Sequence, residues 1–151
     1  MTQLPPEDQP DAIWIDHVGS IPVHYDDDPR FEVEKAARSE GIRQAQAMHT
    51  ADDLLAGMVA DDWHVRIEVI DRLIARAKED DRTVPVLLQA LRADAVPDVR
   101  LGVALGLAWF EGDVRVVAGL REALSDPDED VRDCARQSLI QVGEDPDSKD
   151  V

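Results

Sequence analysis

The residues best suited to chemistry are three arginines that recur at nearly equal spacing. Arg66, Arg100 and Arg132 stand 34 and 32 residues apart. A row of guanidinium groups could bind an anion. We favour a structural role, because repeated charges in a fold most often serve ion pairs. Asp98 and Asp130, each two residues before an arginine, are the partners that we expect in that case.

The other reactive side chains do not form a recognisable catalytic or metal-binding pattern. The acids at 26–28 are a possible divalent-cation site, but the spaced acids, glycine and final glutamate of an EF-hand loop do not follow. We therefore expect a solvated turn in which Asp28 caps a helix. Cys134 lies beside a predicted buried stripe and among acids, which raise a thiol pKa, so it is expected to be structural. No histidines are spaced four apart on a helix, so no zinc site is predicted. The sequence predicts no catalytic residue, no metal and no cofactor.

The aromatic residues are the better candidates for binding another protein. Trp109 and Phe110 end a predicted core helix, and adjacent residues on a helix cannot both face the core. One of them is therefore expected at the surface, unless both are shielded at the helix end. An exposed aromatic beside acids is a good anchor for a protein partner. The candidate partner-binding residues are Trp63, Trp109, Phe110, Glu111 and Asp113.

The elements that position these residues repeat along the chain. After each Val-Arg pair, aliphatic or small residues recur at helical steps of three, seven and eight positions, which predicts an amphipathic helix with one buried stripe. A second helix is expected at 84–91 and at 114–124. Asp126 and Pro127 predict another helix start, with Asp126 as the cap. The stripe consists of Val69, Val103 and Ala135, of Leu73, Leu107 and Leu139, and of Ile74, Ala108 and Ile140.

The residues 98–107 and 130–139 show Asp-Val-Arg followed by small and aliphatic residues. This pattern, with the helix that follows it, resembles HEAT-like repeats of the short phycobilisome-lyase type, over roughly residues 50–143. The resemblance implies a stack of helical hairpins in which the repeated arginine pairs with an acidic or backbone group of a neighbouring repeat. It does not fix the function, since such proteins include bilin lyases, nucleic-acid glycosylases, adaptors and many bacterial proteins of other roles.

The expected fold is an all-α, HEAT-like α-α solenoid of about seven helices with a small N-terminal β-hairpin cap. Its first helix is expected from Pro29 to Met48, with a possible break at Gly41, and its second from the Thr50 cap to about Ala60. The predicted divisions are a disordered 1–10, a single domain at 11–143 and an acidic disordered tail at 144–151. The domain comprises a hairpin cap (11–27), a divergent first hairpin (28–61), repeats at 62–94 and 95–126, and a C-terminal half repeat (127–143).

The charge of the chain restricts the partners that it can bind. With 33 acids, 16 bases and a net charge of −17, it is expected to repel nucleic acid and anionic membrane and to attract basic proteins. We find no signal peptide or membrane span in the sequence, and we expect a cytoplasmic protein. The predicted function is a non-enzymatic protein-interaction module of inhibitor, immunity or adaptor type. The alternatives are a bilin lyase-like chromophore handler and a DNA-mimic inhibitor. The oligomeric state is left open between a monomer and a weak dimer.

Overall fold

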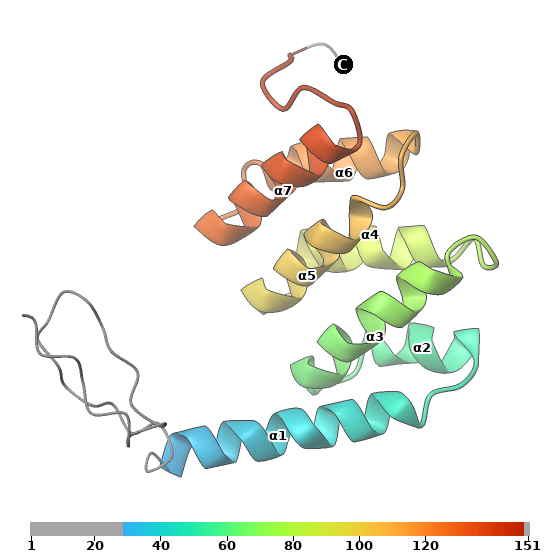
Figure 1. Ribbon diagram of the computed structural model, residues 1–151, viewed down its shortest axis with the longest axis vertical. Helices are drawn as coiled ribbons and strands as arrows, with labels where there is room; N and C mark the ends of the chain where they lie inside the picture. The colour runs from blue at the N-terminus through green and yellow to red at the C-terminus, as the bar shows by residue number, and fades with distance from the viewer. Residues whose placement is uncertain (1–28, 150–151) are drawn as a thin grey trace, which may run out of the picture. The chain divides into compact units, whose positions relative to one another are not determined.

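The computed structural model describes residues 29–149, which form seven α-helices and no strand. The predicted disordered start, the hairpin cap at 11–27 and the Asp28 cap lie outside the described residues. The chain divides into two units, Met1–Arg38 and Ser39–Val151, and the first helix runs across their boundary. The helices (Figure 1) are α1 (Pro29–Gln46), α2 (Ala51–Gly57), α3 (Trp63–Arg76), α4 (Thr83–Ala93), α5 (Pro97–Leu107), α6 (Val114–Ala123) and α7 (Glu129–Gln141).

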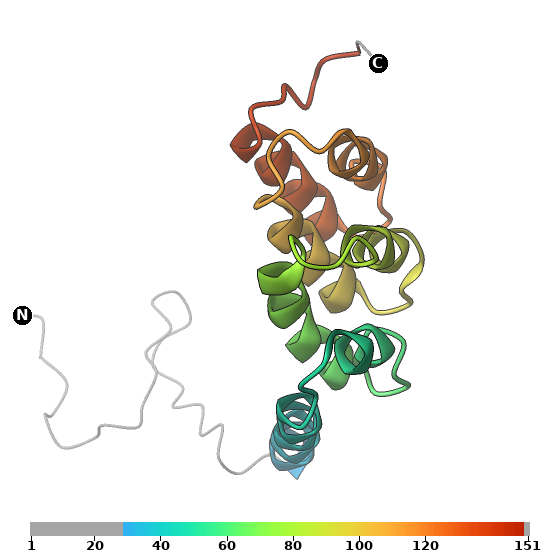
Figure 2. The ribbon, with the colours of Figure 1, turned by 90° about the vertical axis from the view of Figure 1, so that its right-hand side faces the viewer.

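Helices α2 to α7 form two layers. In one layer α3, α5 and α7 lie side by side, and α2, α4 and α6 form the second layer, seen at the right in Figure 2. The three leucines of the predicted stripe, Leu73, Leu107 and Leu139, are buried between the layers, as predicted. The second layer contributes equally buried leucines at Leu54, Leu87 and Leu120. Aromatic residues make up only 4% of the chain, so the helices pack mainly through aliphatic and small side chains. Such side chains let neighbouring helices approach closely.

Side-chain caps begin α2, α3, α6 and α7, whereas α4 and α5 begin without one. Thr50 and Asp53 form a reciprocal capping box at the start of α2, as their spacing suggests. The prediction that Asp126 caps α7 is wrong by two residues. Asp128 is the cap and accepts the N–H of Val131 at 3.2 Å, whereas the Asp126 carboxylate accepts the N–H of Asp128 and faces Arg100. Asp126 is drawn away from the capping role because it has a buried arginine as partner.

Gly41 does not break α1, so the predicted first helix is continuous. The helix passes through it and ends at Gln46. The glycine is needed because α3 approaches here. A β-carbon at position 41 would lie 2.6 Å from the His64 Cβ and 3.0 Å from the His64 backbone carbonyl carbon. The absence of a side chain at Gly41 therefore allows α1 and α3 to pack closely.

The C-terminal segment between Glu144 and Lys149 differs from the disordered tail that we expected. The N–H of Glu144 bonds the Leu139 carbonyl at 2.9 Å, after Gly143 adopts a positive φ of 84°, which closes the end of α7. Arg121 of α6 then donates to the carbonyl oxygens of Asp145 and Ser148, at 3.1 and 3.2 Å. These contacts hold the segment against the last hairpin.

The same segment terminates the stack electrostatically. Arg136 occupies the α7 position that corresponds to Ile70 on α3 and Ala104 on α5, which are both buried where the next helix packs. Within residues 29–149 no helix follows α7, and Arg136 instead pairs with Asp147 at 3.0 Å. Ile140, one turn later, is left 53% exposed. Charged residues at terminal repeats are what a stack requires at its solvent-facing end.

Candidate functional site

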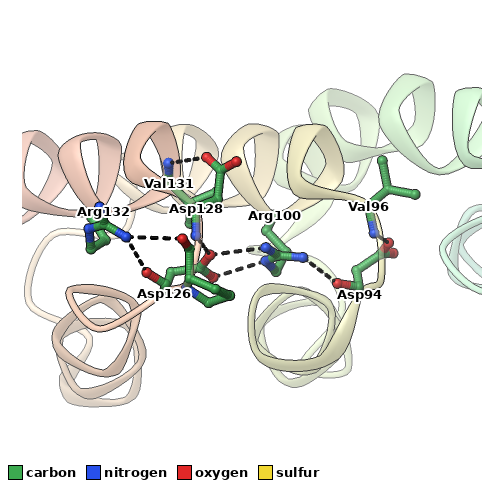
Figure 3. Close-up of polar contacts among 8 residues, drawn as sticks. Asp94, Val96, Arg100, Asp126, Asp128, Val131 and Arg132 are labelled. Atoms are coloured by element: carbon green, nitrogen blue, oxygen red, sulfur yellow. Dashed lines mark hydrogen bonds and ion pairs between the residues drawn. The ribbon is translucent and has the colours of Figure 1, made fainter.

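The repeated arginines form a ladder of hydrogen bonds between consecutive hairpins (Figure 3). Nε and Nη2 of Arg100 donate to the two carboxylate oxygens of Asp126 at 2.9 and 3.0 Å, and its Nη1 donates to the Asp94 carbonyl at 2.7 Å. Arg66 repeats this geometry one hairpin earlier, with Asp94 at 2.8 and 3.0 Å and the Ala60 carbonyl at 2.7 Å. Each of these two arginines therefore ties its own helix start to the loop before it and to the link that leads into the next repeat.

Arg132 is the last arginine of this ladder. Its Nη1 donates to the carbonyl oxygens of Asp126 and Pro127, at 2.7 and 3.1 Å. Within residues 29–149 it forms no ion pair, because no later repeat brings an aspartate to it. The ladder is thus a structural device whose members mainly contact backbone carbonyls and neighbouring loops. We assign no anion site to it.

Asp98 and Asp130 are not the partners of these arginines, contrary to the prediction. Residues two apart on a helix point in nearly opposite directions, so neither acid can reach the arginine that follows it. Both lie exposed in the first turns of α5 and α7, where a negative charge interacts favourably with the helix dipole. The true partners, Asp94 and Asp126, each stand six residues before an arginine. That repeated spacing is the sequence signal that could have found them.

The Arg100–Asp126 pair is nearly buried, and this governs its electrostatics. The two side chains are 10% and 7% exposed. Burial is the largest single influence on Asp126 and raises its pKa. The hydrogen bonds from Arg100 and from the Asp128 N–H outweigh burial, and the pKa lies below its ordinary value. The hydrogen bond from Asp126 raises the pKa of Arg100 despite burial. Both groups stay charged at neutral pH.

The candidate aromatic residues occupy different environments. Trp109 follows the end of α5 and is 77% exposed, whereas Phe110 is half-buried against the core. One of the two faces solvent, as the helical geometry predicted. Trp63 begins α3, is half-buried and stacks on His64 with ring centroids 3.9 Å apart. On α3 the position that corresponds to Trp109 is Ala75, roughly 18 Å along the helix from Trp63. The structure therefore does not bring Trp63 and Trp109 together.

The two candidate acids also differ. Glu111 is exposed two residues after Trp109. Asp113 caps α6 and pairs with the Arg115 guanidinium at 2.7 Å, and the hydrogen bond from Arg115 is the main cause of its lowered pKa. Asp113 thus has a structural role in starting α6, and Glu111 is the acid available beside Trp109.

The sequence analysis missed the apolar residues next to Trp109. Leu105 is 54% exposed and Leu101 is half-buried. Leu101 and Leu105 are four residues apart on one side of α5, and Trp109, four residues further and just past the end of the helix, continues the row. Together they make an apolar ridge, which we call the α5 ridge. The signal for it was present in the spacing, but α5 is apolar on nearly every face, so no polar side marked its outer surface.

A groove lies on the other layer, between α2 and α4. It has a volume of about 440 Å³ and its walls are formed mainly by small apolar side chains, among them Val59, Val86 and Ala90. Arg66 and Asp94 of the ladder stand at its edge. The groove is a shallow concave surface on the side of the stack opposite to the α5 ridge.

Two further features bear on chemistry. Cys134 is buried, and its Sγ faces the Leu101 carbonyl oxygen at 3.8 Å. Burial raises the pKa of its thiol, whereas the sequence analysis attributed the raised pKa to the nearby acids. Within residues 29–149, no cluster of three or more histidine, cysteine or acidic side chains is arranged to hold a metal ion. None of the helices in this part of the chain has the length and apolar character needed to cross a membrane.

Comparison with known families decides the identity of the fold. The family model for HEAT repeats matches residues 51–140. The chain belongs to the HEAT-repeat family. The match begins at α2 and reaches α7, so this HEAT-repeat protein has its family-specific part in the two-layered stack. Searches of curated proteins and of solved structures give no match. HEAT-repeat stacks generally serve as surfaces for binding other proteins.

Proposed function

We propose that this HEAT-repeat protein is a non-enzymatic module that binds a basic protein. The observation that supports the proposal best is the exposure of Trp109, with Glu111 beside it, on a chain of net charge −17. A tryptophan that is 77% exposed leaves a large apolar surface in water, and its burial by a partner is favourable.

The charge has a separate role from the tryptophan. The excess of acids attracts a basic partner from a distance and raises the rate of association, and this attraction weakens as salt screens it. Trp109 contributes only when it contacts the partner, and salt does not screen this apolar contact. Together they fit an inhibitor or immunity-type protein that neutralises a basic enzyme, and they also fit an adaptor within a larger assembly.

The proposal is tested by capture of partners on the immobilised full chain. Cell extract of the source organism is applied at about 50 mM and about 500 mM salt, where the Debye length falls from roughly 14 Å to roughly 4 Å. Captured proteins are identified by mass spectrometry. Trp109→Ser is compared with Val114→Ser, which changes a residue of equal exposure at the start of α6.

We expect a basic protein to be enriched at low salt, retained by Val114→Ser and reduced by Trp109→Ser. If no basic protein is enriched over an unrelated control of similar charge, the proposed function is wrong. If enrichment occurs but Trp109→Ser and Val114→Ser behave alike, the binding of a basic protein stands and the assigned contact residue does not.

One alternative is a chromophore-handling protein like the bilin lyases. The groove between α2 and α4 supports it, because its volume of about 440 Å³ is within the range of small-molecule sites and its walls are apolar. Mixing with bilin would then shift the absorbance of the pigment, and Val86→Asp in the groove wall would abolish the shift.

The other alternative is a DNA mimic. Exposed acids at the starts of α5 and α7, Asp98 and Asp130, support it, since carboxylates can occupy the positions of phosphates on a DNA-binding protein. In that case duplex DNA would compete with the chain for its partner. A partner that binds DNA and the chain simultaneously would contradict the mimic.

A further inference from the structure

The layer of α3, α5 and α7 has one face that the second layer does not cover. Helices α2, α4 and α6 lie on one side of this layer, and from α2 to α7 no helix lies on the other (Figure 2). We call the uncovered side the α5 face. Its centre is the α5 ridge, because α5 is the middle helix of the layer (Figure 1).

The centre of the α5 face is apolar over two helical turns. Leu105 and Trp109 are 54% and 77% exposed, and Leu101 completes the ridge one turn earlier. The ridge extends about 12 Å along α5, from the rise of 1.5 Å per residue. Leu101 also packs against the core, but Leu105 and Trp109 are mainly exposed, so core packing does not account for the apolar character of those two positions.

The margins of the α5 face are acidic. Register along the repeats places Asp71 of α3 beside Leu105 on one side and Gln137 of α7 on the other, with Asp133 one turn before Gln137. Asp98 and Asp130 stand at the starts of α5 and α7 on the same side of their helices, and all four aspartates are exposed. These are the acids that the arginine ladder does not use.

Two arginines on the helices that flank α5 are engaged in contacts elsewhere. Arg72 of α3 donates to the carbonyl oxygens of Ala45 and Met48, at the end of α1 and after it. Arg136 of α7 pairs with Asp147. The charge that a partner meets on this face is therefore mainly negative, around an apolar centre.

Resting on the proposed function, we propose that the α5 face binds a basic amphipathic helix of the partner protein. The apolar stripe of such a helix would cover Leu105 and Trp109, and its lysines or arginines would face Asp71, Asp98 and Asp133. A helix is the matching shape, because the members of the ridge recur once per turn and residues of a partner helix recur at the same spacing.

Charge argues against the two other occupants of this face. A second copy of the chain would place the same aspartates opposite one another in a symmetric contact. The first 30 residues of the chain carry seven acids and one base, so they too would be repelled by the acidic margin. A partner with basic residues at the edges of an apolar stripe has neither difficulty.

The test uses a probe of known chemistry. A fluorescein-labelled synthetic helix of roughly 18 residues, with leucines on one face and lysines on the other, is titrated with the full chain while anisotropy is measured. One control peptide has the same residues in an order that breaks the apolar stripe. The ridge variant Leu105→Ser/Trp109→Ser is compared with Val33→Ser/Val114→Ser, whose residues are 70% and 80% exposed on α1 and at the start of α6.

We expect the amphipathic peptide to bind at least tenfold more tightly than the reordered one. The ridge variant should weaken binding at least tenfold, the paired control less than twofold, and Asp133→Asn roughly threefold at low salt only. Circular dichroism should show unchanged helix content, since all substituted residues are exposed.

Three outcomes would overturn the inference. Equal binding of the two peptides would mean that charge alone attracts them. Equal effects of the ridge variant and its control would place the contact elsewhere. Sedimentation showing a dimer that the ridge variant dissolves, with no peptide binding, would assign the face to a second copy. A basic protein that is still captured in any of these cases leaves the proposed function standing.

Discussion

Breaking the Arg100–Asp126 pair should destabilise the protein far more than breaking an exposed pair of the same chemistry. Asp126→Ala leaves the Arg100 guanidinium without its two carboxylate acceptors in a site where that side chain is 10% exposed. Removing one member of a buried pair costs about 3–5 kcal/mol. We expect about 3 kcal/mol, the lower end, because the pair lies at the edge of the core in the links between helices.

The structure provides a matched control. Arg92 of α4 and Glu122 of α6 also join consecutive hairpins, with Nε to Oε2 at 3.0 Å, but their side chains are 58% and 59% exposed. Exposed pairs contribute about 0–1 kcal/mol. Glu122→Ala should therefore cost less than about 1 kcal/mol, although it removes the same kind of arginine–carboxylate contact from the same stack.

The assay is urea unfolding followed by circular dichroism at the helical band, with the free energy extrapolated to water and the slope checked for each variant. Asp126→Asn, which retains an acceptor for the Asp128 N–H, separates loss of the anion from loss of the loop contact. A double variant with Arg100→Met should cost less than the sum of the single variants, because no unpaired charge remains buried. If Asp126→Ala and Glu122→Ala cost the same within about 0.5 kcal/mol, the argument from burial is refuted.

Three other predictions concern packing, pH and reactivity. Gly41→Ala should lose about 1–3 kcal/mol in thermal unfolding despite its better helix propensity, because the new β-carbon would meet the His64 backbone; Gly112→Ala, at a φ of 81° with open space around it, should lose about 1 kcal/mol from backbone strain alone. The difference in unfolding free energy between the natural chain and Asp126→Asn should stay constant from neutral pH to about 4 and shrink below it, because a lowered pKa stabilises the fold only while the carboxylate is ionised; a constant difference at pH 2 would contradict the assignment. Cys134 should react with a thiol reagent at least roughly 100-fold more slowly in the native chain than in urea, and rapid native labelling would show that it is not buried.

Much of the fold could be predicted because apolar residues recur at the same positions in each repeat. Leu73, Leu107 and Leu139 share one phase, and burial of that phase requires helices stacked in a row. The helix ends were predicted less well where two physical demands compete for one residue. Asp126 satisfies every local rule for a helix cap, yet its bond to Arg100 prevails and Asp128 caps α7 instead.

The candidate site was predicted only in part, for a related reason. Exposure of either Trp109 or Phe110 follows from the helix alone, since neighbours cannot share a face. Which acid meets which arginine depends on loops that return from the next repeat, and local spacing does not describe them. Leu105 was missed because an apolar residue within an apolar helix gives no sign of which way it faces. Only the packing of α3 and α7 against α5 shows that it is left outside.

The substitution of arginine for an aliphatic or small residue at position 136 has a consequence for how such proteins change in length. The links after α4 and after α6 use the same arginine–aspartate contact, so a further unit with that contact would need no change in those already present. Within residues 29–149, a charged side chain and a returning segment lie beside α7, where a next helix would pack. Exchanging that one arginine for alanine and removing the residues after Gly143 would reopen the end, and a duplicated unit could then be joined there to give a longer protein from the same parts.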